Sequence, residues 1–243
     1  MRKLDHAHSP QAIHQRLKDG PKVSYLRDWI YGGIDGAITT FAIVAGVVGA
    51  NLSPAIVLIL GVANLLADGF SMAASNYSGT KAEIDDYERV VAAEKRHIRD
   101  HPEGEKEEVR QIYRAKGFDG EELEELVSLI TSHDDVWLEV MVSEEYGMTA
   151  VQRSPRKAAL ATFWAFVACG AVPLVPFVFG LPASAVWAAV FTGLVFLAIG
   201  AVKSMWSTAA WYWSALETFA IGMSAAGLAY FVGALLTGVF GVA

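Results

Sequence analysis

Long apolar stretches alternate with polar regions along the chain. Five stretches are almost free of charged residues, and each has at least the roughly 20 residues that a membrane-crossing helix needs, the last more than a single span requires. They cover residues 29–50, 55–80, 158–180, 183–202 and 206–240. Because lipid offers no hydrogen-bond partner to a free backbone N–H or C=O group, such stretches are expected to be helical. The pattern predicts an all-α membrane protein with five transmembrane helices.

The polar regions complete the domain organisation. We expect an N-terminal arm at 1–28, the first two spans at 29–80, a helical insert at 81–157, and the last three spans at 158–243. The insert lies between the second and third spans, and its polar pattern predicts three helices. The first of these continues out of the second span, and the third has a break or a new cap at 132–134.

The basic residues set an orientation for these spans. Of the 19 Lys and Arg residues, six lie in 1–28, twelve lie in 81–157, and the last is Lys203. Cytoplasmic segments of membrane proteins carry an excess of Lys and Arg. The arm and the insert are therefore expected in the cytoplasm, and the C-terminus outside. The expected partners are the lipid bilayer, divalent metal ions and protons, and no nucleic acid.

Ionisable side chains within the spans are functional candidates, because a charge inside a membrane is unfavourable. Asp35 and Asp68 are the strongest, whereas Glu217 is closer to an interface. Asp35 is eight residues beyond Arg27, hence about 12 Å into the first span. Met72, on the returning span, is expected at nearly the same depth.

The antiparallel hairpin of the first two spans would then present two layers. Asp35 faces Met72 in one layer, Thr39 faces Asp68 in the next, and Asn64 lies a turn beyond. A carboxylate combined with a thioether suits Fe²⁺ or a neighbouring ion better than Mg²⁺ or Ca²⁺. The simpler interpretation is that Met72 packs the core and the aspartates form caps or interhelical hydrogen bonds. A carboxylate also binds H⁺, so metal and proton compete for it.

The insert holds a second group of candidate ligands, which share helical faces by their spacing. They are Glu94, His97 and His101 on the first helix, Glu105 and Glu108 on the second, and Met141 and Glu145 on the third. If the three helices bring these side chains together, they would bind a metal ion. The alternative is an ordinary solvated surface, because the insert has twenty acidic against twelve basic residues. Glu94 and His97 form a Glu-x-x-His motif, but di-iron carboxylate bundles carry two copies and this chain has one, which argues against an iron oxidase.

Two segments carry a resemblance to a known family. They read DGAITTFAIVAG at 35–46 and GFSMAASNY at 69–77, the second followed by TKAE at 80–83. Together with the order of spans and the acidic insert, they resemble the vacuolar iron transporter family, which includes the yeast Ca²⁺-sensitive cross-complementer type of iron and manganese carriers. The compact chain favours a bacterial member, for which the membrane is the plasma membrane.

The resemblance implies a homodimer that exchanges cytoplasmic Fe²⁺ for protons through the first two spans. It implies that Asp35 is the essential carboxylate and Met72 the pathway methionine. It also implies an insert that collects ions, with no permanently bound cofactor. The ligands that it implies there are Glu94, Glu105, Glu108, Met141 and Glu145.

The chain departs from the plant members of that family at three places. His97 replaces a glutamate, Val142 replaces the second of two methionines, and Asp68 replaces a small residue. These departures leave the transported ion open among Fe²⁺, Mn²⁺, Co²⁺ and Zn²⁺. Two other classes of function remain as alternatives: a membrane-anchored iron-binding or iron-oxidising protein, and a metal sensor that transports nothing.

Overall fold

A computed structural model describes residues 7–20, 23–150 and 153–241. The first six residues of the predicted arm, and the last two of the chain, lie outside these ranges. The described residues contain helices and no strand. The chain divides into two compact units, one made of residues 1–76 and 156–243 and the other of residues 77–155. These bounds are close to those predicted for the insert.

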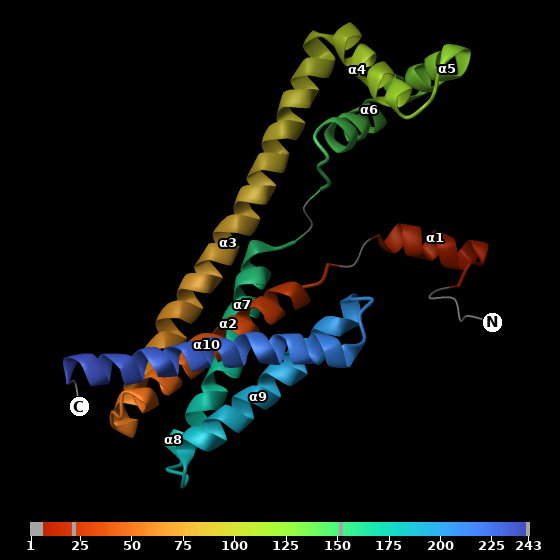
Figure 1. The fold of residues 1–243 in the computed structure, drawn as a ribbon. Helices are drawn as coiled ribbons and strands as arrows, with labels where there is room; N and C mark the ends of the chain where they lie inside the picture. Colours follow the sequence, from red (N-terminus) through yellow and green to blue (C-terminus); the bar gives the residue numbers. More distant parts are fainter. Residues whose placement is uncertain (1–6, 21–22, 151–152, 242–243) are drawn as a thin grey trace. The chain divides into compact units, whose positions relative to one another are not determined.

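The first unit is built from long apolar helices (Figure 1). They are α2 (Leu26–Gly49), the first part of α3 (Pro54–Asp100), α7 (Pro155–Ala171), α9 (Ser184–Lys203) and α10 (Trp211–Phe240), and the four-residue helix α8 (Val175–Val178) lies between α7 and α9 in the sequence. The short polar helix α1 (Pro10–Asp19) precedes them. Asn51 and Pro54 form the tight turn between α2 and α3, where Asn51 adopts a left-handed conformation with φ 55°.

Five helical segments of the described chain are long and apolar enough to cross a membrane. Two differ in detail from the predicted spans. The 3₁₀ turns η2 (Val172–Leu174) and η3 (Ser204–Trp206) interrupt the third span and precede the fifth. The fifth helix accordingly begins at Trp211 rather than at residue 206. Pro173 explains the interruption at η2, because proline lacks the N–H that an α-helical bond requires.

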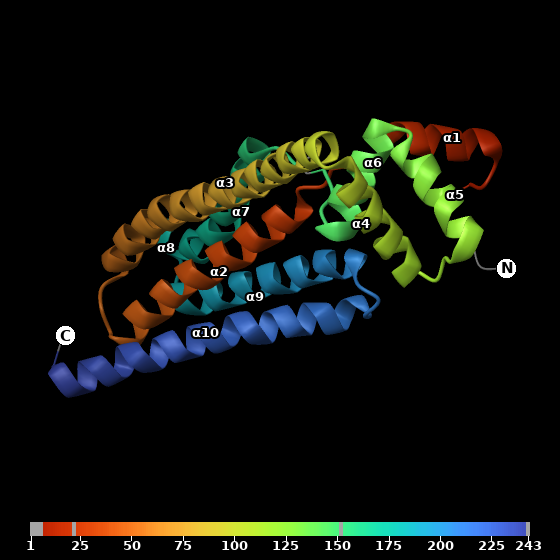
Figure 2. The same cartoon turned by 90° about the horizontal axis from the view of Figure 1, so that it is seen from above.

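Helix α2 is the centre of the first unit. It packs against α9 and α10 on one side, and Figure 2 shows α3 and α7 on the other. The main hydrophobic cluster joins α2 to its neighbours through Phe41 and Val44, Leu65 of α3, Phe166 of α7 and Leu174. This packing holds the polar residues of α2 and α3 at fixed positions.

The second unit contains the end of α3 and four short helical elements. These are α4 (Pro102–Ala115), α5 (Gly120–Thr131), α6 (Asp134–Val140) and the π-helix η1 (Met141–Glu145). The chain breaks between α5 and α6, where His133 has extended backbone angles. The core of the unit includes Val109, Leu123 and Trp137. The predicted third insert helix is thus three consecutive pieces.

Candidate metal pathway and metal-binding cluster

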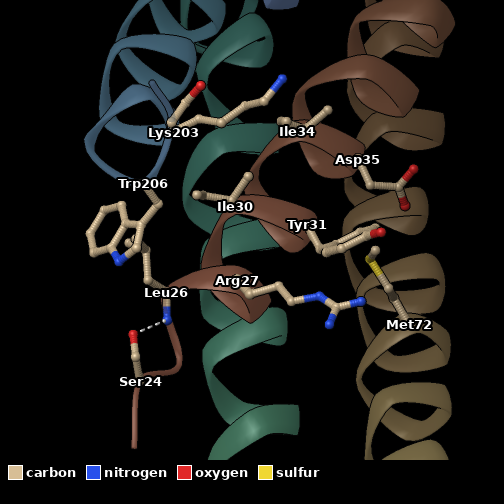
Figure 3. A pocket seen from close by; sticks show the side chains of 11 residues that line it. Ser24, Leu26, Arg27, Ile30, Tyr31, Ile34, Asp35, Met72, Lys203 and Trp206 are labelled. Atoms are coloured by element: carbon tan, nitrogen blue, oxygen red, sulfur yellow. Dashed lines mark hydrogen bonds between the residues drawn. The ribbon is translucent and has the colours of Figure 1, made fainter. Parts of the chain in front are cut away.

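A cavity of about 890 Å³ lies in the first unit (Figure 3). Its wall includes Arg27, Tyr31, Asp35, Met72, Lys203 and Trp206. The side chains of Asp35, from α2, and Met72, from α3, both lie between these two helices. The structure therefore places the predicted carboxylate and thioether on the wall of one cavity.

Close helix packing fixes the position of α2 beside α7. A Cβ atom added to Gly36 would lie 2.3 Å from the backbone oxygen of Phe166, and one added to Gly32 would lie 2.2 Å from that of Thr162. Such approaches are possible only for glycine, as is usual where membrane helices pack closely. Since Asp35 adjoins Gly36, the glycine contact also sets the position of the carboxylate.

Replacing Gly36 is expected to destabilise the first unit. We expect Gly36→Ala to lower the free energy of unfolding by about 1–3 kcal/mol, because the new methyl group meets backbone that cannot move aside. Gly46→Ala, on the same helix, is the control, because its Cβ would lie 3.6 Å from the nearest atom. Thermal unfolding in detergent measures both variants, and equal melting temperatures would contradict the packing argument.

The second predicted layer contains a hydrogen bond between α2 and α3. The side-chain amide of Asn64 donates to the hydroxyl of Thr39 at 3.1 Å and approaches that of Thr40 at 3.5 Å. Asn64, one turn from Asp68, therefore ties α3 to Thr39. Asp68 is exposed on the surface of the first unit and is not among the residues that line the cavity.

A polar junction joins α2, α3 and α7 near the polar ends of these helices. The amide of Asn76 donates to the carboxylate of Asp28 at 2.8 Å and to the hydroxyl of Thr162 at 2.7 Å. Asp28 and Thr162 are both buried. The sequence did not indicate this junction, because Asp28 and Asn76 lie close to the ends of predicted spans, where polar residues are common.

The second unit contains a compact group of metal-ligating side chains. The possible ligand atoms of Glu94, His97 and Glu105 all lie within 4.8 Å of one another. His97 Nδ1 is 3.3 Å from Glu94 Oε1 and 3.6 Å from Glu105 Oε1. Helix α3 provides Glu94 and His97, and α4 provides Glu105. We call these three residues the insert cluster.

The two carboxylates of the insert cluster are buried. Glu94 is 0% exposed and Glu105 is 5% exposed. The Oε2 atom of each is buried without a hydrogen-bond partner. A buried charge without compensation is strongly unfavourable, so such a pair is stable when a proton or a cation neutralises it. Three ligand atoms at this spacing can hold a divalent ion that accepts imidazole and carboxylate together.

Further acidic groups surround the insert cluster. Burial, and then the negative charges of Glu108 and Glu94, raise the pKa of Glu105 to about 7. Burial and the same two charges raise the pKa of Glu145. Burial and the bond to Glu94 raise the pKa of Tyr146 to about 12, so its hydroxyl stays protonated and donates to Glu94 Oε1 at 3.0 Å. The charges that raise these pKa values come from Glu94 and Glu108, so the four predicted acidic ligands, Glu94, Glu105, Glu108 and Glu145, lie near one another.

Met141 occupies a different environment from these acids. It is 0% exposed and packs in the hydrophobic core of the second unit with Val109 and Trp137. It begins the π-helix η1, which ends at Glu145. Single π-helical turns occur frequently at functional sites. Its role as a ligand stays a prediction.

Comparison with known proteins identifies the family. The profile of the VIT family matches residues 26–234, which is most of the chain. The chain belongs to the VIT family. Two plant relatives are similar over nearly their whole length. "Vacuolar iron transporter 1" of Eucalyptus grandis is 32% identical over 89% of this chain and 90% of its own, and the Arabidopsis thaliana protein of that name is 32% identical over 84% and 83%.

The parasite relatives of the VIT family are longer. "Vacuolar iron transporter" of Toxoplasma gondii is 36% identical over 71% of this chain, and the match spans 60% of that protein. The predicted resemblance is thus confirmed, and the family together with the apolar helices makes the chain an integral membrane protein.

Proposed function

We propose that this VIT-family chain transports a divalent transition metal, Fe²⁺ first, out of the cytoplasm in exchange for protons. The single observation that carries this proposal is the cavity wall that Asp35 and Met72 share in the first unit. A carboxylate and a thioether together suit a borderline or soft divalent ion, since Mg²⁺ and Ca²⁺ prefer oxygen ligands alone. The names of the relatives support iron as the cargo.

Exchange for protons follows from the chemistry of Asp35. A carboxylate binds either a proton or a metal ion, and each excludes the other. Arrival of a proton from outside would release the metal there, and loss of the proton in the cytoplasm would free the carboxylate for the next ion. The carboxylate thereby couples the two flows. The distribution of Lys and Arg supports a cytoplasmic N-terminus and insert.

The insert cluster would collect ions in the cytoplasm. Its three ligand groups come from adjacent helices of one compact unit, and its buried carboxylates need a neutralising partner. The proposed cargo supplies that partner. A sensor or buffer that transports nothing would use the same cluster, so metal binding alone does not distinguish the two functions and transport does.

Preference between Fe²⁺ and Mn²⁺ is tested by competition. We expect Fe²⁺, kept reduced under anaerobic conditions, to be taken up by proteoliposomes in preference to Mn²⁺ at equal concentration, because the thioether of Met72 favours the softer ion. Met72→Leu keeps the volume and removes the sulfur, so it should bring the two uptake rates together. A Met72→Leu variant with the wild-type preference would show that another residue selects the ion.

A homodimer accounts for the exposed face of α3. Asp68, Ser71 and Ser75 are exposed there within the membrane-spanning part of the helix. A carboxylate facing hydrocarbon is unfavourable, and a second copy packed along α3 would cover it. Small polar residues such as these serine side chains are common where membrane helices meet.

Cross-linking tests the dimer. In a Cys169→Ala background, Ser71→Cys should form a covalent dimer with a short bis-maleimide in membranes. Leu194→Cys, on α9 and 59% exposed, is the control and should stay monomeric, because that face would meet lipid. Equal cross-linking of both variants would indicate random collision, and no cross-linking of Ser71→Cys would contradict a dimer along α3.

A further inference from the structure

Lys203 and Glu217 are the two charged residues of the stretch 158–243. The structure brings them together: Lys203 Nζ lies 3.0 Å from Glu217 Oε2, across the contact between α9 and α10. Two charges placed singly on neighbouring membrane helices, and paired with each other, are functional candidates.

Lys203 also lines the cavity that holds Asp35 and Met72. It is the last residue of α9, where a cation is favourable at the negative end of the helix dipole. In Figure 3 its side chain extends from the end of α9 toward α2, the helix that carries Asp35. Glu217 is not among the residues that line the cavity. One member of the pair thus lines the proposed metal pathway, and its partner, whose side chain is 60% exposed, lies outside the lining.

We propose that Lys203, positioned by Glu217, is a fixed positive charge that sets the affinity of the cavity for divalent cations. This inference rests on the proposed function. An ammonium group on the wall repels an arriving dication, and the effect is strong where lipid and protein lower the dielectric constant. The pair with Glu217 keeps the ammonium at the wall, which prevents it from pairing with Asp35 in place of the metal. The cavity therefore binds its cargo weakly enough to release it.

The two members of the pair have opposite effects under this proposal. Lys203→Gln removes the repelling charge and should lower the KM for Fe²⁺ roughly three- to tenfold, a range expected for one charge across a partly solvated cavity. Glu217→Gln frees the ammonium to approach Asp35 and should raise the KM by a similar factor. The exchanged pair, Lys203→Glu with Glu217→Lys, restores the ion pair between α9 and α10 but puts a carboxylate on the cavity wall. Because a carboxylate attracts a dication, this variant should also lower the KM.

A purely structural ion pair makes different predictions. Both single variants would then impair transport in the same direction, and the exchanged pair would restore wild-type behaviour. Lys157→Gln is the control for loss of a basic residue, because Lys157 is exposed at the start of α7 and does not line the cavity. It should keep the wild-type KM.

The experiment measures initial rates of Fe²⁺ uptake into proteoliposomes against Fe²⁺ concentration for all five proteins. Opposite shifts of KM in the two single variants support the proposal. Three results would overturn it: KM shifts of the same sign in the two single variants, a wild-type KM in the exchanged pair, or single variants whose KM equals that of Lys157→Gln. Absence of uptake by the wild type would instead contradict the proposed function. Equilibrium binding of Mn²⁺ to the same variants, with the insert cluster disabled by Glu94→Gln and Glu105→Gln, then tests the same opposite shifts without transport.

Discussion

Asp35→Asn is expected to abolish proton-coupled metal uptake while leaving metal binding by the insert intact. Asparagine keeps the shape of the side chain but has no carboxylate charge and cannot take up a proton. It would therefore neither attract a dication nor exchange it for H⁺. The expected loss in rate is roughly 10- to 100-fold or more, since even the loss of a residue that supports a metal ligand lowers affinity by that factor.

The control for this variant is Asp19→Asn. Asp19 is an exposed acid of α1 that accepts a hydrogen bond from Gln15, and it has no place in the cavity. Uptake by Asp19→Asn should equal that of the wild type. Mn²⁺ titration of Asp35→Asn should still show binding, because the insert cluster belongs to the other unit. Full transport by Asp35→Asn would remove this residue from the mechanism.

The second large effect concerns the stability of the metal-free protein as the pH changes. The pKa of Glu105 rises from its usual value of 4.5 to about 7 in the folded state. Between these values the folded state holds a proton that the unfolded state has lost, so stability falls as the pH rises from about 4.5 to 7. The loss is on the order of 3 kcal/mol at pH 8. A bound dication neutralises the carboxylates and should restore the stability.

Thermal unfolding of the full chain at pH 5.5, 6.5 and 7.5 measures this effect, with and without Mn²⁺. The wild type should become less stable toward pH 7.5 and regain stability with Mn²⁺. Glu105→Gln should lose most of both responses. Glu103→Gln is the control on the same helix, because Glu103 is exposed and pairs with Lys106, and it should behave as the wild type. A metal-free wild type that gains stability toward pH 7.5 would contradict the burial of a carboxylate pair.

The helices could be predicted because their apolar stretches are long and the charged residues between them are concentrated. The continuation of α3 beyond the membrane-spanning part also followed from the sequence, since no proline or glycine pair interrupts it before Pro102. The bounds near residues 172 and 206 were less predictable. There η2 occurs within apolar sequence and η3 directly follows Lys203, and hydropathy alone does not distinguish a 3₁₀ turn from an α-helical one.

The contacts of the candidate site could be predicted only where they depend on how deep each residue lies in its membrane-spanning helix. Asp35 and Met72 share a cavity wall because both are close to the same distance from the polar ends of an antiparallel hairpin. The hydrogen bond from Asn64 to Thr39 was not predicted, because the choice among residues one turn apart depends on how α3 is rotated, and neighbouring helices set that rotation. Tyr146 contacts Glu94, and Lys203 lines the cavity, because of tertiary packing. Residue spacing along one helix does not predict such contacts.

Fe²⁺ accumulation in proteoliposomes with an acidic lumen tests the central claim most directly. The wild type should concentrate Fe²⁺ inside while the lumen loses protons, and a protonophore that dissipates the pH gradient should stop the accumulation. Metal bound by the protein, without accumulation in the lumen at any pH gradient, would contradict transport and favour a metal sensor or buffer.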